Sequence, residues 1–381
     1  MTTPTTAQSP IHTGEPILKV TDLGVDFYVD GEWYPAAIDV TYEVHPGEVV
    51  AIVGESGSGK TQSSMSLIGL LPPNGRARGS AKMGDQELIG MSSAKLRHVR
   101  GKEVAVIFQE PMTALNPVYT VGFQIVETLR THFDMGPAAA KARAIELLTL
   151  VEMPDPETRF HSYPHQLSGG QRQRAMIAQS LSCDPKLLIA DEPTTALDVT
   201  VQAEILKLMR DLRSRIDSGI ILITHDMGVV ADMADRILVM RNGRVVETGD
   251  SAQIFGNPQH PYTRELLDAV PHLGEAGPVS VDEYEMEHGG DTPLGAAVMT
   301  ATDIVVEYPK RGRTPAFRAV DGVSLTINQG EVVGLVGESG SGKTTIGRTV
   351  VGLLPVTGGQ LEIAGINMVG ARQKDLKPLR S

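Results

Sequence analysis

The stretch Gly54-Glu55-Ser56-Gly57-Ser58-Gly59-Lys60-Thr61 decides the fold of this chain of 381 residues. Residues 48–53, which precede it, are short, apolar and β-branched, and therefore predict a buried strand. Residues 62–71, which follow it, are expected to form a helix. A glycine-rich loop that ends in Lys-Thr between a strand and a helix is the pattern of a phosphate-binding P-loop.

Local chemistry explains why these residue types receive phosphate. Gly57 and Gly59 let the backbone turn tightly, so that several N–H groups point at one anion, and the helix N-terminus adds its partial positive charge. Lys60 can reach the β- and γ-phosphates, and the Thr61 hydroxyl can hold Mg²⁺. A flexible Gly/Ser turn that matches by chance is disfavoured by the flanking strand and helix. The expected nucleotide contacts are Gly54, Glu55, Ser56, Gly57, Ser58, Gly59, Lys60, Thr61 and Gln62.

Composition and charge narrow the class of protein. The chain is 41% hydrophobic and 21% charged, and it is long enough for two domains. A net charge of −12 argues against a nucleic-acid partner, because phosphate backbones need a basic face. The single cysteine, Cys183, allows neither an intramolecular disulfide nor a cysteine-ligated cluster. No apolar run approaches the ~20 residues that span a bilayer, so we expect membrane association only through a partner.

Polar residues follow three further apolar segments that predict buried strands. Gln109 follows residues 104–108, Asp191 and Glu192 follow residues 187–190, and His225 comes soon after residues 220–223. Helical patterns separate these segments, so we expect a parallel α/β sheet that gathers ligand groups at the carboxyl ends of its strands.

Two other segments carry expectations about the ligand. Ser168-Gly169-Gly170-Gln171 places small residues before a helix and predicts a second anion-receiving N-terminus. Residues 17–44 read as short strands with a turn at Asp30-Gly31. In this zone Phe27 or Tyr28 could stack on a nucleobase, but an aromatic residue that fills the core fits the sequence equally well.

The chain then repeats itself at a constant offset of 283 residues. Gly330 repeats Gly47, and Gly352 repeats Gly69. The second P-loop runs from Gly337 to Thr344, and we infer the duplication of a whole domain. Counterparts of Gln109 and Glu192 at this offset would fall after Ser381, so we expect a partial second copy, from a longer two-domain protein or a broken gene. The expected divisions are a disordered tail (1–15), a first domain (16–250), a C-terminal tail (251–275), a linker (276–299) and the partial copy (300–381).

Taken together, the motifs of the first copy resemble those of an ABC transporter nucleotide-binding domain. This resemblance implies a P-loop NTPase with a parallel-sheet core, an antiparallel β subdomain and a helical subdomain. The motifs that carry it are Walker A (54–61), the Q-loop glutamine Gln109, the signature (167–171), Walker B (187–191), the catalytic glutamate Glu192, the D-loop with Asp198, the switch histidine His225 and the adenine-stacking Phe27.

The resemblance also implies roles in ATP hydrolysis. Thr61, Gln109 and Asp191 would bind Mg²⁺, Glu192 would polarise the attacking water, and His225 would reach the γ-phosphate. The signature of one domain closes over the ATP of another complete domain, supplied by a homodimer or by an intact tandem copy. In a tandem copy, the receiving loop contains Gly337, Gly340, Gly342, Lys343, Thr344 and Thr345.

Three stretches narrow the resemblance to the oligopeptide/dipeptide importers: residues 108–117, 191–198 and 260–263. This implies two membrane permease subunits, an indirect link to a solute-binding protein, and a place on the cytoplasmic face of the plasma membrane. Residues 112–122 are the candidate surface for the permeases. The alternatives are a soluble ABC ATPase of translation or DNA repair, and an inactive remnant. The acidic Gly/Pro linker resembles neither the charged helical linker of the translation type nor the coiled coil of the repair type.

Overall fold

The computed structural model describes residues 14–195, 197–213, 218–269, 295–309, 316–337 and 340–371. The chain divides into two compact units, Met1–Pro271 and His272–Ser381, and each is described by itself. Most of the expected N-terminal tail and the expected linker as far as residue 294 lie outside the described residues.

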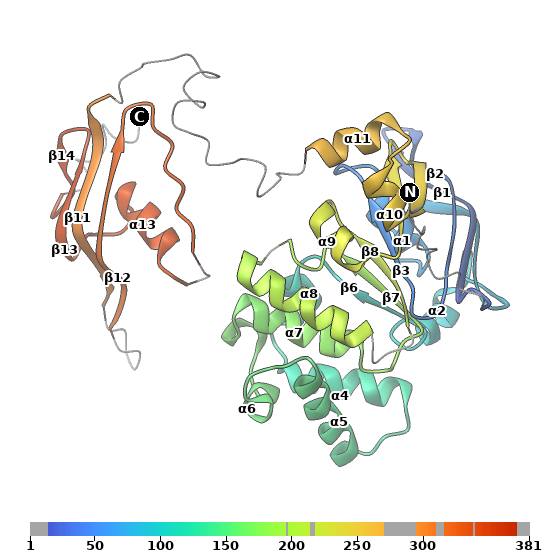
Figure 1. The fold of residues 1–381 in the computed structure, drawn as a ribbon. Coiled ribbons are helices and arrows are strands. Elements are labelled where there is room, and N and C mark those ends of the chain that lie inside the picture. The colour runs from blue at the N-terminus through green and yellow to red at the C-terminus, as the bar shows by residue number, and fades with distance from the viewer. Residues whose placement is uncertain are drawn as a thin grey trace, which may run out of the picture. The chain divides into compact units, whose positions relative to one another are not determined.

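A sheet of six strands forms the core of the first unit (Figure 1). Its order is β10-β9-β3-β8-β7-β6, and all neighbours are parallel except β10 and β9. The expected buried strands are confirmed, although the sheet is mixed rather than wholly parallel, because Asn242 and Gly243 turn the chain directly from β9 into β10. The strands are β3 (Val49–Val53), β6 (Val104–Ile107), β7 (Leu187–Asp191), β8 (Gly219–Ile223), β9 (Arg236–Arg241) and β10 (Arg244–Asp250).

A second sheet, which is antiparallel, packs on one face of the six-stranded sheet. Its order is β2-β1-β4-β5, and Asp30 and Gly31 make the predicted turn with positive φ angles. Its strands are β1 (Leu18–Val29), β2 (Glu32–Val44), β4 (Gly75–Met83) and β5 (Gln86–Glu87). β1 and β2 have 12 and 13 residues, so the expectation of short strands was wrong here. Val50 and Ile52 of β3 share one buried cluster with Leu18 of β1, which fixes the P-loop strand under this sheet.

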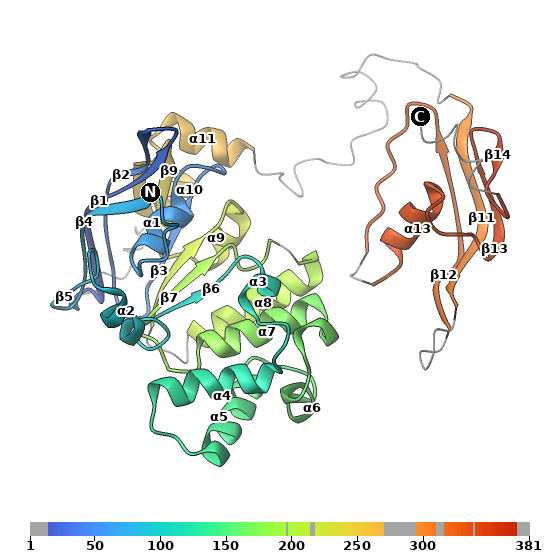
Figure 2. The ribbon, with the colours of Figure 1, turned by 180° about the vertical axis from the view of Figure 1, so that it is seen from behind.

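Helices cover the other face and extend into a separate helical region (Figure 2). One buried cluster joins this region to the sheet, because Ile125 of α4 and Leu147 of α5 belong to the same cluster as Leu188 of β7. The helices before β8 are α1 (Lys60–Ser66), α2 (Ser93–Val99), α3 (Pro111–Ala114), α4 (Val121–His132), α5 (Pro137–Leu150), α6 (Pro156–Phe160), the 3₁₀ turn η1 (Pro164–Gln166), α7 (Gly169–Ser180) and α8 (Val199–Arg213).

Three helices close the first unit: α9 (Met227–Met233), α10 (Ser251–Gly256) and α11 (Pro261–Asp268). They bury Ala51 and Val53 of β3 together with Ile254 of α10 and Tyr262 of α11. The P-loop strand is therefore covered on one side by the antiparallel sheet and on the other by the end of this unit.

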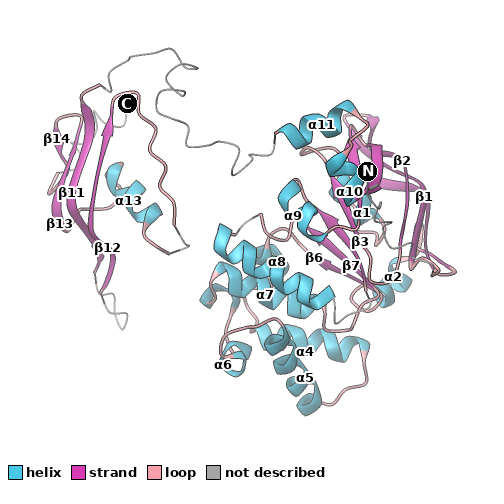
Figure 3. Ribbon diagram, viewed as in Figure 1, coloured by secondary structure: helices cyan, strands magenta, loops and turns pink. Residues whose placement is uncertain are grey.

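The second unit contains an antiparallel sheet (Figure 3), and its strand order repeats that of the antiparallel sheet in the first unit. Its order is β12-β11-β13-β14, with α13 (Lys343–Val350) packed on the sheet through Ile346. Its strands are β11 (Ala297–Tyr308), β12 (Phe317–Asn328), β13 (Gly358–Ile363) and β14 (Ile366–Asn367).

The counterpart of β3 in the second unit behaves differently. Residues 332–336 form no strand, and Val332 and Val336 are 96% and 92% exposed, whereas every residue of β3 is 0% exposed. β3 is hydrogen-bonded on both edges by β8 and β9, and the described part of the second unit contains no strand paired with residues 332–336. β3 is therefore a strand because it is paired on both edges, and its local sequence pattern alone is not enough to make residues 332–336 a strand.

Candidate functional site

The P-loop adopts a turn that glycine alone fits at two positions. Gly57 and Gly59 have φ angles of +80° and +96°, where L side chains are strained. A Cβ atom on Gly59 would lie 2.1 Å from the carbonyl oxygen of Ala36, whereas one on Gly57 would meet open space. The loop is therefore packed against Ala36 of β2 at Gly59 and has open space beside Gly57.

Lys60 lies inside the curve of this loop. Its side chain is buried, and Nζ donates hydrogen bonds to the carbonyl oxygens of Gly54 at 2.7 Å and Glu55 at 2.8 Å. Burial lowers the pKa of the Lys60 amine, while the charges of Glu192, Asp191 and Glu55 oppose that shift. The loop thus presents a preorganised cation among backbone N–H groups, which is what a triphosphate requires.

A hydroxyl and a carboxylate meet beside the lysine. Thr61 Oγ1 donates a hydrogen bond of 2.9 Å to Oδ1 of Asp191, at the end of β7. Burial raises the pKa of Asp191, and the hydrogen bond from Thr61 acts against that rise. Both groups are hard oxygen donors, which is the kind of ligand that suits Mg²⁺.

The carboxylate of Glu192, which follows β7, contacts side chains that follow two other strands, β6 and β8. Its Oε2 accepts hydrogen bonds from Gln109 Nε2 at 2.8 Å and from Thr195 Oγ1 at 3.1 Å, and its Oε1 lies 3.1 Å from His225 Nδ1. The backbone of Glu192 has a φ of +44°, an uncommon conformation for a residue other than glycine, and its N–H donates to the carbonyl of Ile223. Gln109, Glu192 and His225 therefore converge as predicted.

Lys60, Thr61, Gln109, Glu192 and His225 line one cavity of about 660 Å³, whereas Asp191 and Thr195 bond to its wall residues without lining it. Sequence reasoning missed three residues here: Ala36 and Leu266, which line the cavity, and Thr195, which bonds to Glu192. Thr195 follows Glu192 by three residues in the Asp-Glu-Pro-Thr-Thr run, which is a signal that could have found it, whereas no sequence pattern marks Ala36 or Leu266 as a cavity residue.

The structure does not bring every predicted residue to this cavity. Phe27 is partly buried in the core beneath the antiparallel sheet, and a Cβ atom on Gly75 would lie 2.8 Å from its ring. Tyr28 is about half exposed and packs on Trp33, with ring centroids 5.2 Å apart. Neither aromatic residue lines the cavity, so this geometry favours the core-filling interpretation of Phe27.

The signature segment also lies outside this cavity. Ser168 begins α7 with a capping box, in which its side chain accepts from the N–H of Gln171. A Cβ atom on Gly170 would lie 2.6 Å from Val201 of α8, and Asp198 accepts from the N–H of Val201. None of Ser168, Gly169, Gly170, Gln171 and Asp198 lines the P-loop cavity of this chain.

The second P-loop repeats the backbone turn of the first. Gly340 and Gly342 have φ angles of +86° and +96°, and Lys343 Nζ donates to the carbonyl of Gly337 at 2.6 Å. Thr344 is exposed and Thr345 is half-buried. The loop conformation thus forms locally, while its preceding segment has no strand partners among the described residues.

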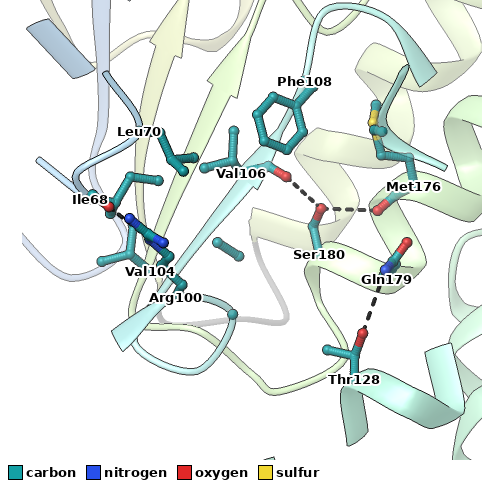
Figure 4. A pocket seen from close by; sticks show the side chains of 13 residues that line it. Ile68, Leu70, Arg100, Val104, Val106, Phe108, Thr128, Met176, Gln179 and Ser180 are labelled. Carbon is teal, nitrogen blue, oxygen red and sulfur yellow. Dashed lines mark hydrogen bonds between the residues drawn. The ribbon is translucent and has the colours of Figure 1, made fainter. Parts of the chain in front are cut away.

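A second, apolar hollow of about 210 Å³ lies between β6, α4 and α7 (Figure 4). Phe108, Leu70 and Ala114 are among its lining side chains. Arg100 closes one end by donating to the carbonyl oxygens of Ile68 and Gly69. The hollow adjoins α3, the start of the segment expected to meet the permeases.

Comparisons with known proteins agree with this geometry. The ABC transporter family model matches residues 38–195 and 320–380, and the model for the oligopeptide/dipeptide transporter C-terminal region matches residues 246–285. The chain is 45% identical over 374 residues to the glutathione import ATP-binding protein GsiA of Escherichia coli (strain K12), with 92% of this chain and 60% of that protein covered. It is 44% identical over 373 residues to the peptidoglycan transport ATP-binding protein YejF of Agrobacterium fabrum, with 96% and 66% covered.

Solved structures give the same result. A dimeric post-hydrolysis state of the ATP-binding cassette MJ0796 bound to ADP and Pi aligns with a TM-score of 0.56 at 26% identity, covering 61% of this chain and 98% of that one. The cbiO1 protein from Clostridium perfringens, part of the ABC transporter complex cbiONQ, aligns with a TM-score of 0.53 at 28% identity, covering 69% and 98%. The chain spans less than two thirds of the length of the relatives GsiA and YejF. With the P-loop, the Asp191-Glu192 strand end and both family matches in place, the chain belongs to the ABC transporter family, as an ATP-binding cassette with an oligopeptide/dipeptide-type C-terminal region.

Proposed function

We propose that this chain binds and hydrolyses ATP and thereby energises an importer of short peptides. The observation that carries the proposal is the position of the Glu192 carboxylate. Gln109, Thr195 and His225 hold it at the wall of the cavity that also contains Lys60. A fixed carboxylate beside a phosphate-binding loop is the arrangement that water activation for phosphoryl transfer needs.

Each residue of the cavity has a defined task in this proposal. Lys60 and the loop N–H groups bind the β- and γ-phosphates. Thr61 and Asp191 hold Mg²⁺, which when bound neutralises phosphate charge. Glu192 accepts a proton from the attacking water, and Gln109 and His225 keep its carboxylate oriented. The contribution is electrostatic and positional, because phosphoryl transfer asks little covalent chemistry of the protein.

A second complete domain is part of the proposal. Ser168 and Gly170 lie outside the cavity of Lys60, so their helix N-terminus is free to meet a phosphate bound by another copy. The MJ0796 cassette bound to ADP and Pi is described as dimeric, which supports this arrangement. In an intact tandem protein, the loop that contains Lys343 would receive this signature.

The permease surface is proposed at residues 112–122 and the adjoining hollow (Figure 4). Met112, Val118 and Tyr119 are exposed, and Tyr119 stacks on Phe123 with ring centroids 4.8 Å apart. An exposed apolar cluster of this kind suits a short apolar helix end of a membrane subunit. Because this surface follows Gln109 directly, movement here would reach the carboxylate of Glu192.

Location and substrate follow from the same proposal. Within the described ranges of the chain, no helix is both apolar enough and long enough to span a membrane. As the ATPase of an importer, the chain is placed by this proposal at the cytoplasmic face of the plasma membrane through two permease subunits, with an indirect link to a solute-binding protein. The match to the oligopeptide/dipeptide C-terminal region supports a peptide substrate, and the glutathione import relative supports a short one.

Magnesium-dependent ATP turnover tests the proposal. The wild-type chain should hydrolyse ATP at a rate per molecule that rises with protein concentration, because a second copy must supply its signature. Glu192→Gln should lose at least tenfold in turnover and keep its affinity for ATP, and Glu127→Gln, an exposed carboxylate on α4, is the matched control. Unchanged turnover in Glu192→Gln would remove that residue from the role of base.

A further inference from the structure

The C-terminal end of the first unit reaches back to the P-loop. The hydroxyl oxygen of Tyr262, on α11, accepts a hydrogen bond of 2.9 Å from the backbone N–H of Glu55. The two residues are 207 positions apart in the chain. Glu55 is the second residue of the glycine-rich loop, so α11 contacts the loop where it leaves β3.

Tyr262 is held rigidly in this position. Tyr262 is 1% exposed and packs in one cluster with Ala51 and Val53 of β3. The guanidinium of Arg241 lies over the ring, 4.5 Å from its centroid. A buried ring with packed neighbours has few alternative rotamers, so its hydroxyl is a fixed acceptor.

The helix that carries Tyr262 is anchored separately. The carboxylate of Glu247, on β10, accepts hydrogen bonds from the backbone N–H groups of Gln259 at 2.7 Å and His260 at 2.9 Å. His260 in turn caps α11, since its Nδ1 accepts from the N–H of Tyr262. These contacts fix the start of α11 to the core sheet independently of the loop.

The same helix also forms part of the cavity wall. Leu266 follows Tyr262 by four residues and therefore lies on the same helix face. Its side chain lines the 660 Å³ cavity together with Lys60 and Gln62. α11 thus touches the site twice, once through a loop N–H group and once through the wall of the cavity.

We propose that Tyr262 is a positioning residue for nucleotide binding: its hydroxyl fixes the Glu55 N–H and so holds the P-loop in its phosphate-receiving turn. The inference rests on the proposed ATP-binding function and assigns to the oligopeptide-type C-terminal region a direct part in the nucleotide site. Leu266 gives the same region a contact surface for the bound nucleotide.

Tyr262→Phe is the variant that tests this, because it removes the hydroxyl and keeps the packed ring. Tyr42→Phe is the matched control, since Tyr42 is also buried and its hydroxyl has no hydrogen-bond partner within the described residues. Two readouts are needed: amide hydrogen exchange at Glu55 in nucleotide-free protein, and the affinity for a fluorescent ATP analogue with Mg²⁺.

We expect Tyr262→Phe to speed exchange at Glu55 and to weaken nucleotide affinity by about three- to tenfold, the effect of one net hydrogen bond, with turnover at saturating ATP unchanged. Leu266→Ala should weaken affinity without altering exchange at Glu55, and Tyr42→Phe should change neither readout. Unchanged affinity in Tyr262→Phe, whether or not exchange or the melting temperature changes, would reduce Tyr262 to a structural contact. A wild-type chain that binds no nucleotide would overturn the proposed function and the positioning role, while the exchange measurement would still decide whether the loop contact exists.

Discussion

Thr61 donates a hydrogen bond of 2.9 Å to Asp191, although the two residues are 130 positions apart in the chain. The sheet order β3-β8-β7 explains this contact. Parallel strands end at the same edge, so the loop after β3 and the end of β7 face one another across the end of β8. The contact joins the phosphate loop to the acidic strand end, and the proposed chemistry depends on it.

Asp191→Asn should weaken the dependence of nucleotide binding on Mg²⁺. The amide keeps the size of the side chain and removes the negative charge that favours a divalent cation. We expect the ratio of ATP affinities with Mg²⁺ and with EDTA to fall at least fivefold in titration calorimetry. An unchanged ratio would show that the metal is held elsewhere.

His225→Ala should lower the rate of ATP turnover while leaving the affinity for ATP nearly unchanged. His225 Nδ1 lies 3.1 Å from Glu192 Oε1, so its loss removes one of the three side-chain contacts that hold the carboxylate and makes no direct change to the P-loop. Turnover should fall at least tenfold while affinity for ATP changes by less than about threefold, in line with the loss of one positioning group. His165→Ala, in the helical region, is the control and should change neither quantity. A loss of affinity that matches the loss of turnover would contradict this role.

The two P-loops should contribute unequally to nucleotide binding. Lys60 is buried within a loop whose strand is paired on both edges, whereas Lys343 follows a segment that is exposed. Lys60→Ala should therefore weaken ATP binding at least tenfold, since charge-assisted hydrogen bonds to phosphate are among the strong ones. Lys343→Ala should change affinity less than twofold in the same titration. Equal losses in the two variants would show that the second loop is an equivalent site.

The strand before the first P-loop and its counterpart before the second should also contribute unequally to the stability of the protein. Ile52 is 0% exposed in β3, and its counterpart at the offset of 283 residues, Leu335, is 48% exposed. Ile52→Ala should lower the free energy of unfolding by about 2–5 kcal/mol because it leaves a cavity in a packed core. Leu335→Ala should stay within about 0.5 kcal/mol, as exposed substitutions do. Scanning calorimetry of both variants checks the pair, and equal destabilisation would contradict the exposure of residues 332–336.

Much of the site could be predicted because its residues follow strands. Gln109, Glu192 and His225 each come directly or soon after an apolar run, and parallel strands bring such positions to one edge. The turn at Gly57 and Gly59 could also be predicted, because the positive φ angles there depend on the local residue type. The sequence therefore predicted both the strand ends and the loop.

Other features depend on packing that sequence spacing does not encode. The antiparallel course of β10, the position of Phe27 within a core and the contact between Tyr262 and Glu55 all arise from tertiary neighbours. Residues 332–336 make the point most clearly: they share the pattern of β3 but form no strand, because a strand needs partners on its edges.

The most direct test of the central claim is a structure of the Glu192→Gln variant determined with ATP and Mg²⁺. The account predicts that the β- and γ-phosphates lie against the N–H groups of the P-loop and Lys60, with the metal beside Thr61 and Asp191 and residue 192 facing the γ-phosphate. A nucleotide bound elsewhere on the first unit, or phosphates out of reach of Lys60, would contradict the account.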